Sequence, residues 1–152
     1  MLTNIPVSAH PTIAITASHM QRHCENGLAV AKYLEANDKI AWVNYPGLES
    51  SKDYAVAQKY MPGGTCGVVS FGVKGGREAA AAFMNGLQMI AIETHVADAR
   101  SCCLHPATTT HRQLSDADLI ACGVGPDLVR LSCGIEDAED LIADIQQALD
   151  KI

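Results

Sequence analysis

A single arginine stands within an apolar segment near the C-terminus, in the stretch DLVRLSCG at residues 127–134. Side chains of a strand alternate between its two faces, so Val129 and Leu131 share one face while Arg130 and Ser132 share the other. A charge that is buried without a partner carries a large free-energy penalty. The guanidinium of Arg130 therefore needs either an acidic partner or a solvent-filled cleft.

Two interpretations of Arg130 remain open from the residues alone. The first is a structural ion pair with a surface acid, a common and weak interaction in proteins. The second is a binding site for a carboxylate, because the planar guanidinium can donate two parallel hydrogen bonds to the two carboxylate oxygens. The sequence pattern does not choose between them.

A second group of chemically active side chains lies a little earlier in the chain. It consists of His95, Asp98, Cys102, Cys103, His105 and His111. Side chains of these types bind transition metals, but their spacing matches no established ligand signature. Histidines beside proline and threonine more often bond local backbone groups. A metal-dependent hydrolase is therefore the weaker hypothesis, and we expect no metal site.

Glycines in GVKGGREA, at residues 72–79, lie between a predicted strand and a predicted helix. Backbone N–H groups at such a junction can bind a phosphate. The segment matches neither of the two common glycine-rich phosphate-binding signatures. The pattern therefore favours a plain turn.

Composition excludes several classes of function. The chain has 152 residues, a net charge of −6 and only 11 dispersed Lys and Arg residues, which argues against a nucleic-acid partner. No apolar run is long enough to cross a membrane, and the N-terminus lacks the basic start of a secretory signal. The six cysteines contain no CxxC pair and are expected to be free thiols. We expect a cytoplasmic protein.

Hydrophobic periodicity predicts the elements that must position these residues. Helices are expected over residues 20–34, from Ser50 or Ser51 to Tyr60, over 77–87, after a cap at Ser115, and from Glu136 or Asp137 to Leu149. Strands are expected over residues 39–45, 65–73, 89–96, 101–106 and 127–133. Most connections are too short for an all-parallel sheet, so we expect an α+β two-layer sandwich with helices on one face of a mostly antiparallel sheet.

Five segments together resemble one enzyme family. They are MQRHCEN, VNYPGLES, FGVKGGREAA, HPATTTHRQLS and GPDLVRLSCGIEDAEDLIADIQQAL. In this order they are similar to the C-terminal domain of O-acetylhomoserine sulfhydrylase, a member of the Cys/Met metabolism family of pyridoxal-phosphate enzymes. The resemblance covers residues 20–149, and five motifs in register are far more specific than any one of them.

The resemblance implies a fold and a substrate site. It implies the fold of the C-terminal domain of fold-type I pyridoxal-phosphate transferases, which closes the substrate cleft over a larger cofactor domain. It assigns Arg130 to the α-carboxylate of the substrate, O-acetyl-L-homoserine, and places His95 and Ser132 at the same cleft. His95 begins a His-Val-Ala-Asp segment where family members usually have Asn-Val-Gly-Asp or Ser-Leu-Gly. An imidazole therefore replaces a small polar side chain there.

The resemblance also sets limits. Residues 1–19 do not resemble the segment that precedes this domain in the family and are expected to form a leader before a domain at residues 20–152. The family's cofactor lysine has no counterpart among the six lysines, so we expect pyridoxal phosphate in the full-length family but none bound to this chain alone. The chain would then be inactive by itself and would self-associate through its uncovered cleft face. The alternative is a non-catalytic binding or assembly module that kept the fold.

Overall fold

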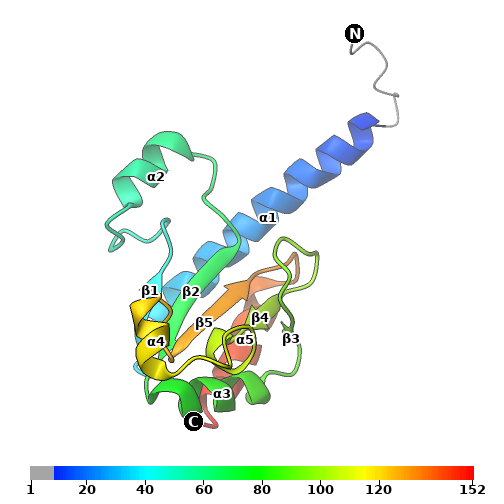
Figure 1. The fold of residues 1–152 in the computed structure, drawn as a ribbon. Helices are drawn as coiled ribbons and strands as arrows, with labels where there is room; N and C mark the ends of the chain where they lie inside the picture. Colours follow the sequence, from blue (N-terminus) through cyan, green and yellow to red (C-terminus); the bar gives the residue numbers. More distant parts are fainter. Residues whose placement is uncertain (1–8) are drawn as a thin grey trace.

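A computed structural model describes the backbone of residues 9–152 and the side chains of residues 18–152 (Figure 1). Its helices are α1 (Ala9–Glu35), α2 (Tyr54–Tyr60), α3 (Gly76–Gly86), a 3-10 turn η1 (Pro106–Thr108), α4 (Asp116–Ala121) and α5 (Ala138–Leu149). Its strands are β1 (Ile40–Asn44), β2 (Val68–Val73), β3 (Ala91–Ile92), β4 (Cys102–Leu104) and β5 (Leu128–Ser132).

The five strands form one sheet in the order β1-β2-β5-β4-β3. The pairs β1–β2, β2–β5 and β5–β4 are antiparallel, and only β3–β4 is parallel. The strand that carries Arg130 is therefore central, with β2 on one side and β4 on the other. The prediction of an α+β fold with a mostly antiparallel sheet is confirmed.

Helices α1, α3 and α5 cover one face of this sheet. Their apolar stripes meet alternate strand residues such as Phe71, Val129 and Leu131, which are all almost fully buried. The rings of Phe71 and Phe83 pack edge to face, with 5.7 Å between their centroids. The main hydrophobic cluster thus lies on the helical side, whereas the other face of the sheet carries Arg130 and Ser132 beside the buried Leu104 and Cys102.

Helix α2 stands away from this core at the end of an arm, and α1 projects past the sheet at its N-terminal end (Figure 1). The predicted serine cap of α2 was wrong, because the helix begins after Asp53, which makes no side-chain cap bond. The Ser51 hydroxyl instead accepts the N–H of Asp53 at 3.3 Å, and Ser50 donates to Glu35. The predicted cap at Ser115 is confirmed, since its hydroxyl accepts the N–H of Asp118.

Two predicted boundaries moved. The helix expected from residue 20 begins at Ala9 and so crosses the proposed limit between residues 19 and 20. Residues 1–8 lie outside the described part of the chain, and the division into a leader and a domain stays a prediction. The strand expected over residues 89–96 is only two residues long, because the chain leaves the sheet after Ile92 and forms an exposed loop.

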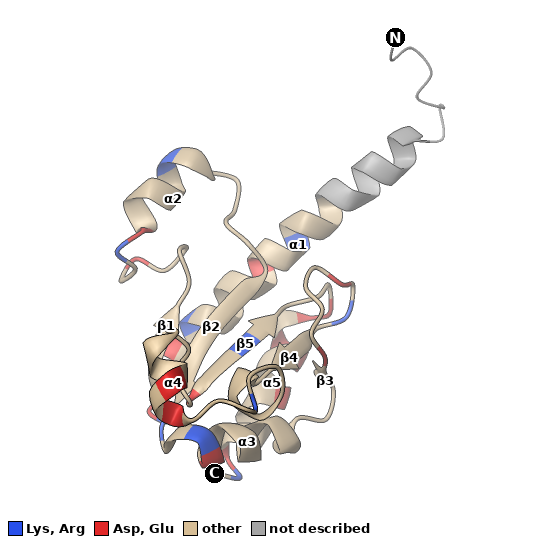
Figure 2. Cartoon of the chain, viewed as in Figure 1, with Lys and Arg blue, Asp and Glu red and all other residues tan. Residues whose placement is uncertain are grey.

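No helix in the described part of the chain is long and apolar enough to span a membrane. Lysines and arginines are scattered over several elements in Figure 2 and do not gather into one basic face in that view. This distribution agrees with the sequence argument against a phosphate-backbone partner.

Candidate functional site

Arg130 lies in the middle of the sheet face that the core helices leave uncovered. In the strand register it stands opposite Ser70 of β2 and opposite Leu104 of β4. Its strand neighbours Val129 and Leu131 point into the core and are at most 1% exposed, whereas Arg130 itself is half-buried. The alternation predicted from the sequence is confirmed, and it places the guanidinium on the face away from the helices.

The guanidinium is held by backbone carbonyls. Its Nη2 donates to the carbonyl oxygen of Thr94 at 2.8 Å and to that of His95 at 3.2 Å. Its Nε is buried and has no hydrogen-bond partner. Among residues 18–152, no carboxylate lies within ion-pair distance of Arg130, so the structural ion-pair interpretation has no acidic partner in this part of the chain.

This arrangement suits an incoming anion. Carbonyl partners orient a guanidinium but leave its positive charge uncompensated, and a buried N–H donor without a partner is costly. A carboxylate would satisfy both the charge and the free Nε donor, because it can accept parallel hydrogen bonds from one guanidinium. The geometry therefore fits carboxylate binding.

Ser132 lies on the same face as Arg130, two residues further along β5. Its hydroxyl accepts the N–H of Ala97 at 3.0 Å, and its side chain is almost fully buried. A cavity of about 150 Å³ lies beside it, lined also by Val68, Val96 and Cys133. The serine hydroxyl thus anchors the loop that follows β3, and a direct contact between Ser132 and a substrate stays a prediction.

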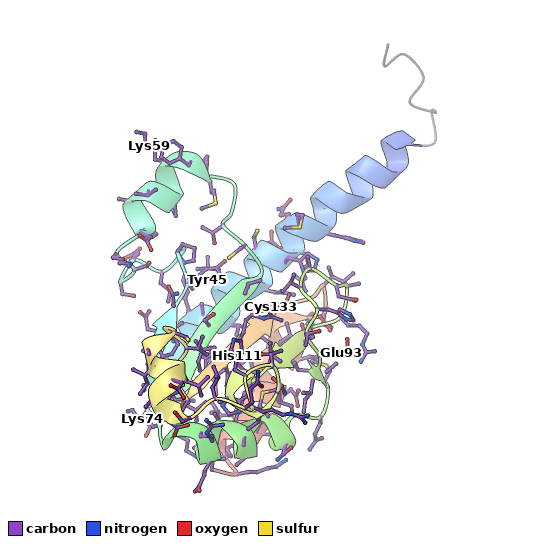
Figure 3. All side chains as sticks on the ribbon, viewed as in Figure 1. Tyr45, Lys59, Lys74, Glu93, His111 and Cys133 are labelled. Atoms are coloured by element: carbon purple, nitrogen blue, oxygen red, sulfur yellow. The ribbon has the colours of Figure 1, made fainter. Side chains whose placement is uncertain are left out.

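His95 contributes mainly through its backbone. Its carbonyl oxygen accepts hydrogen bonds from Arg130 and, at 3.0 Å, from the thiol of Cys102. The imidazole is 66% exposed, with Nδ1 3.0 Å from a carboxylate oxygen of Glu93. Glu93 lies at the outer edge of the molecule beside β3 (Figure 3). A role for the imidazole in substrate binding stays a prediction.

Ala97 is strained within the same loop. Its φ of 57° makes it the only non-glycine residue with positive φ in the described part of the chain. The left-handed conformation costs an L-residue about 1–2 kcal/mol, and glycine avoids this cost. Glycine also has more conformational entropy in the unfolded chain, which offsets part of the gain in stability. We expect Ala97→Gly to raise the free energy of unfolding by about 0.5–1 kcal/mol in urea denaturation. Ala99→Gly serves as control, and an equal gain there would remove the strain explanation.

The histidines and cysteines that lie close together in the sequence at residues 95–111 do not converge on one site in the structure. No group of three or more potential metal ligands occurs among the described residues. His105 is fully buried between the Thr108 hydroxyl and the carbonyl oxygen of Pro126, and burial lowers the pKa of its imidazole. Because a carbonyl can only accept, Nε2 of His105 carries the proton and Nδ1 accepts.

The thiols near Arg130 are poor nucleophiles. Burial raises the pKa of Cys102 and of Cys103, and it raises the pKa of Cys133 to about 12. These thiols therefore stay protonated near neutral pH, which disfavours thiolate chemistry and metal binding. All six cysteines are free, as predicted.

Sequence reasoning missed the residues that hold the loop in place. Glu136 accepts hydrogen bonds from both the N–H and the hydroxyl of Ser101, and Asn26 of α1 donates to the carbonyl oxygens of Gly134 and Glu136. The one sequence feature that could have indicated them is Gly134 with the acid Glu136 two residues later, just after the strand of Arg130. Its meaning depends on α1 and on the loop, both distant in sequence.

Comparison with known proteins identifies the family. The model of the Cys/Met metabolism PLP-dependent enzymes matches residues 14–150. The chain belongs to this family. The family is pyridoxal-phosphate dependent and acts in cysteine and methionine metabolism, so the resemblance stated from the motifs is confirmed.

Individual relatives of this family share much of the chain. An O-acetyl-L-homoserine sulfhydrylase of Leptospira meyeri is 46% identical over 88% of the chain and 30% of its own length. A homocysteine synthase of Schizosaccharomyces pombe is 45% identical over 86% of the chain and 30% of its length. The chain thus spans about a third of the length of these curated relatives.

A solved structure is similar as well. It is described as an O-acetylhomoserine (thiol)-lyase from Campylobacter jejuni and contains N'-pyridoxyl-lysine-5'-monophosphate. The match has a TM-score of 0.80 and 35% identity, over 88% of this chain and 32% of that one. The predicted fold, that of a domain of pyridoxal-phosphate enzymes, is confirmed.

The residues around Arg130 do not fit the cofactor of this family as a covalent site. Among residues 18–152, no lysine lines the cavity beside Ser132 or hydrogen-bonds to residues 93–101. The ammonium groups of Lys39 and Lys151 instead bond backbone carbonyls elsewhere.

Proposed function

We propose that this chain forms the carboxylate-binding part of an O-acetylhomoserine sulfhydrylase. The parent reaction replaces the acetoxy group of O-acetyl-L-homoserine with sulfide or a thiol, giving homocysteine or methionine and acetate. Arg130 binds the α-carboxylate of the amino acid, and the backbone of Thr94 and His95 orients the guanidinium. The carbonyl-held guanidinium with its free Nε carries this proposal.

Three further observations support the proposal. Relatives whose names give sulfhydrylase or homocysteine synthase activity are 45–46% identical to this chain. The contacts between the Arg130 guanidinium and the carbonyls of Thr94 and His95 are exposed, so a ligand can approach the guanidinium there. The free cysteines are consistent with work in the reducing cytoplasm.

The chain does not hold pyridoxal phosphate by itself under this proposal. We expect no aldimine absorbance band when the purified chain is mixed with pyridoxal phosphate. After borohydride reduction, we expect that no particular lysine is modified stoichiometrically. Mass spectrometry of peptides from the reduced protein measures this. Stoichiometric labelling of one lysine would contradict the proposal and indicate a cofactor site within this chain.

An NMR titration of the chain with O-acetyl-L-homoserine separates the proposed function from a non-catalytic assembly module. Chemical-shift changes at Arg130 on addition of O-acetyl-L-homoserine support a substrate-binding role. Acetate added at the same concentration is the control for a non-specific anion effect. Shift changes confined to other surfaces would favour the assembly module.

We also expect the isolated chain to self-associate, most simply as a two-fold dimer. Ile92 and Val96 flank the Arg130 site and are 50% and 52% exposed, and Met20 beside the Ser132 cavity is 42% exposed. Apolar area exposed in this way tends to be covered, and closed pairs are the commonest assembly. Sedimentation over a range of concentrations measures the association. A monomer at the highest concentration would contradict it, and Val96→Ser should weaken any dimer.

A further inference from the structure

The loop at residues 93–101 has little apolar packing to fix its position. Residues 92–100 are all exposed, including the side chain of Val96. An exposed segment of this kind is held by its hydrogen bonds, each of which contributes about 0.5–1.5 kcal/mol and more when one partner is charged. The contacts of this loop therefore decide where it lies.

The carboxylate of Glu136 binds the C-terminal end of this loop, at Ser101. Its Oε1 accepts the N–H of Ser101 at 2.6 Å, and its Oε2 accepts the hydroxyl of Ser101 at 2.9 Å. The same hydroxyl accepts the N–H of Gly134 at 2.7 Å. Both oxygens of one carboxylate are thus used on a single loop residue, and charge-assisted bonds of this kind are the strong ones.

The hydrogen bonds between Glu136 and Ser101 require a glycine at position 134. A Cβ at this position would lie 2.4 Å from the carbonyl oxygen of Ala99 and 2.4 Å from Oε2 of Glu136. The close approach of the loop to the end of β5 therefore requires a residue without a side chain. The backbone of Glu136 is fixed independently, because Asn26 donates to its carbonyl oxygen at 2.8 Å and Arg22 does so at 3.1 Å.

The other end of the loop fixes Arg130. The carbonyl oxygens of Thr94 and His95 are the hydrogen-bond acceptors of its guanidinium, and the N–H of Ala97 is bound by Ser132. Between the two ends, Ile135 donates its N–H to the carbonyl of Ala99 at 3.0 Å. The loop thus connects Ser101, which Glu136 binds, to the carbonyl oxygens of Thr94 and His95 that orient Arg130.

We propose that Glu136 is a positioning residue for the carboxylate site. By binding Ser101 it fixes the loop at residues 93–101, whose Thr94 and His95 carbonyl oxygens orient the guanidinium of Arg130. This inference rests on the proposed function only in its consequence for substrate binding. The mechanical part concerns contacts within this chain and is measurable without any ligand.

The test compares Glu136→Gln with Glu139→Gln in the full 152-residue chain. An amide keeps the size of the side chain but puts an NH2 donor in place of one carboxylate oxygen, so one of the two bonds that Ser101 donates to separate oxygens loses its acceptor, and the negative charge is lost. Glu139 is exposed in the first turn of α5, and its carboxylate holds no hydrogen bond to the loop, so its substitution removes the same charge. Two ligand-free quantities are measured by NMR: the rotation rate of the Arg130 guanidinium about its Nε–Cζ bond and the hydrogen-exchange rate of the Ala97 amide.

We expect Glu136→Gln to raise both rates about fivefold or more, since loss of charge-assisted bonds frees the loop, and Glu139→Gln to leave them unchanged. Ser101→Ala removes the hydroxyl from the same contact and should raise both rates as well, so it replaces Glu136→Gln should that variant unfold. Unchanged rates at Arg130 and Ala97 in both variants would overturn the inference, even if exchange of the Ser101 amide increased.

A binding measurement separates this inference from the proposed function. With O-acetyl-L-homoserine as probe, Glu136→Gln should raise the dissociation constant about tenfold, since a misaimed guanidinium loses part of a charged contact. If Arg130→Ala leaves the affinity unchanged, the proposed function fails, and the two ligand-free rates still decide whether Glu136 positions Arg130. If Arg130→Ala abolishes binding and Glu136→Gln changes neither rate nor affinity, only the positioning inference fails.

Discussion

Under the proposed function, replacing Arg130 with alanine is expected to lower kcat/KM for O-acetyl-L-homoserine by about 30- to 1000-fold when the chain acts together with a cofactor domain of this family. The range corresponds to roughly 2–4 kcal/mol, the usual loss for a charged contact to a carboxylate. The free energy of unfolding should change little, because the guanidinium bonds only two exposed loop carbonyls and lies on the face away from the core. Steady-state kinetics and urea denaturation of the same preparations measure the two quantities.

Two further variants sharpen this test. Arg100→Ala removes an equal charge from the exposed loop at residues 93–101, which holds the guanidinium of Arg130. Among residues 18–152, the only hydrogen bond of Arg100 is made by its backbone N–H, to Asp98, so this variant should leave kcat/KM nearly unchanged. Arg130→Lys keeps the charge but loses the planar fork and should be intermediate. A large fall in melting temperature with unaltered kinetics would instead show that Arg130 is structural.

The placement of Arg130 was predictable because strand alternation is local. Five residues suffice to put Val129 and Leu131 on one face and Arg130 on the other, and the apolar neighbours show which face is buried. The pattern could not reveal that the partners of Arg130 would be carbonyls. Thr94 and His95 come from a loop more than 30 residues earlier, and backbone acceptors have no signature in the sequence.

The boundaries that moved have a similar cause. The segment at residues 89–96 has the composition of a strand, but its last backbone bond to β4 is the one from the Glu93 N–H to the carbonyl of Cys103. The carbonyls of Thr94 and His95 accept from Arg130 in place of a neighbouring strand, and the next N–H, that of Ala97, bonds Ser132. The cap of α2 was misplaced because the Ser50 hydroxyl bonds Glu35 on α1. In both cases a side chain distant in sequence competed with a local preference, and tertiary contacts of this kind override local propensity.

A buried carboxylate in α5 gives the largest expected effect on stability. Asp144 is only 7% exposed, and its oxygens accept the N–H groups of Gln88, Met89 and Ile90 at 2.8–3.0 Å, together with the side-chain amide of Gln147. These bonds fix the turn that leads from α3 into β3. The carboxylate therefore supports the start of the loop that orients Arg130, from the opposite side of the sheet.

We expect Asp144→Asn to lower the free energy of unfolding by about 2–4 kcal/mol, because one amide oxygen cannot accept three N–H groups and those left buried and unpaired are costly. The melting temperature should fall by roughly 10 °C for a domain of this size. Asp140→Asn is the matched control, since this carboxylate is exposed in the first turn of the same helix. Calorimetry of the three proteins makes the comparison.

The effect of Asp144 should also depend on pH in one direction. Burial alone would raise the pKa of this carboxyl, but the N–H groups of Ile90, Gln88 and Met89 outweigh burial and hold the pKa below its ordinary value of 3.8. A carboxyl whose pKa is lowered by folding stabilises the protein above the unfolded value, and this contribution is lost as the pH falls through the folded value. The stability curves of the wild-type chain and Asp144→Asn should therefore lie apart at neutral pH and approach each other in acid below about pH 4. A difference that is constant from pH 7 to pH 3 would show that the carboxylate charge contributes nothing, and that the variant acts only through packing.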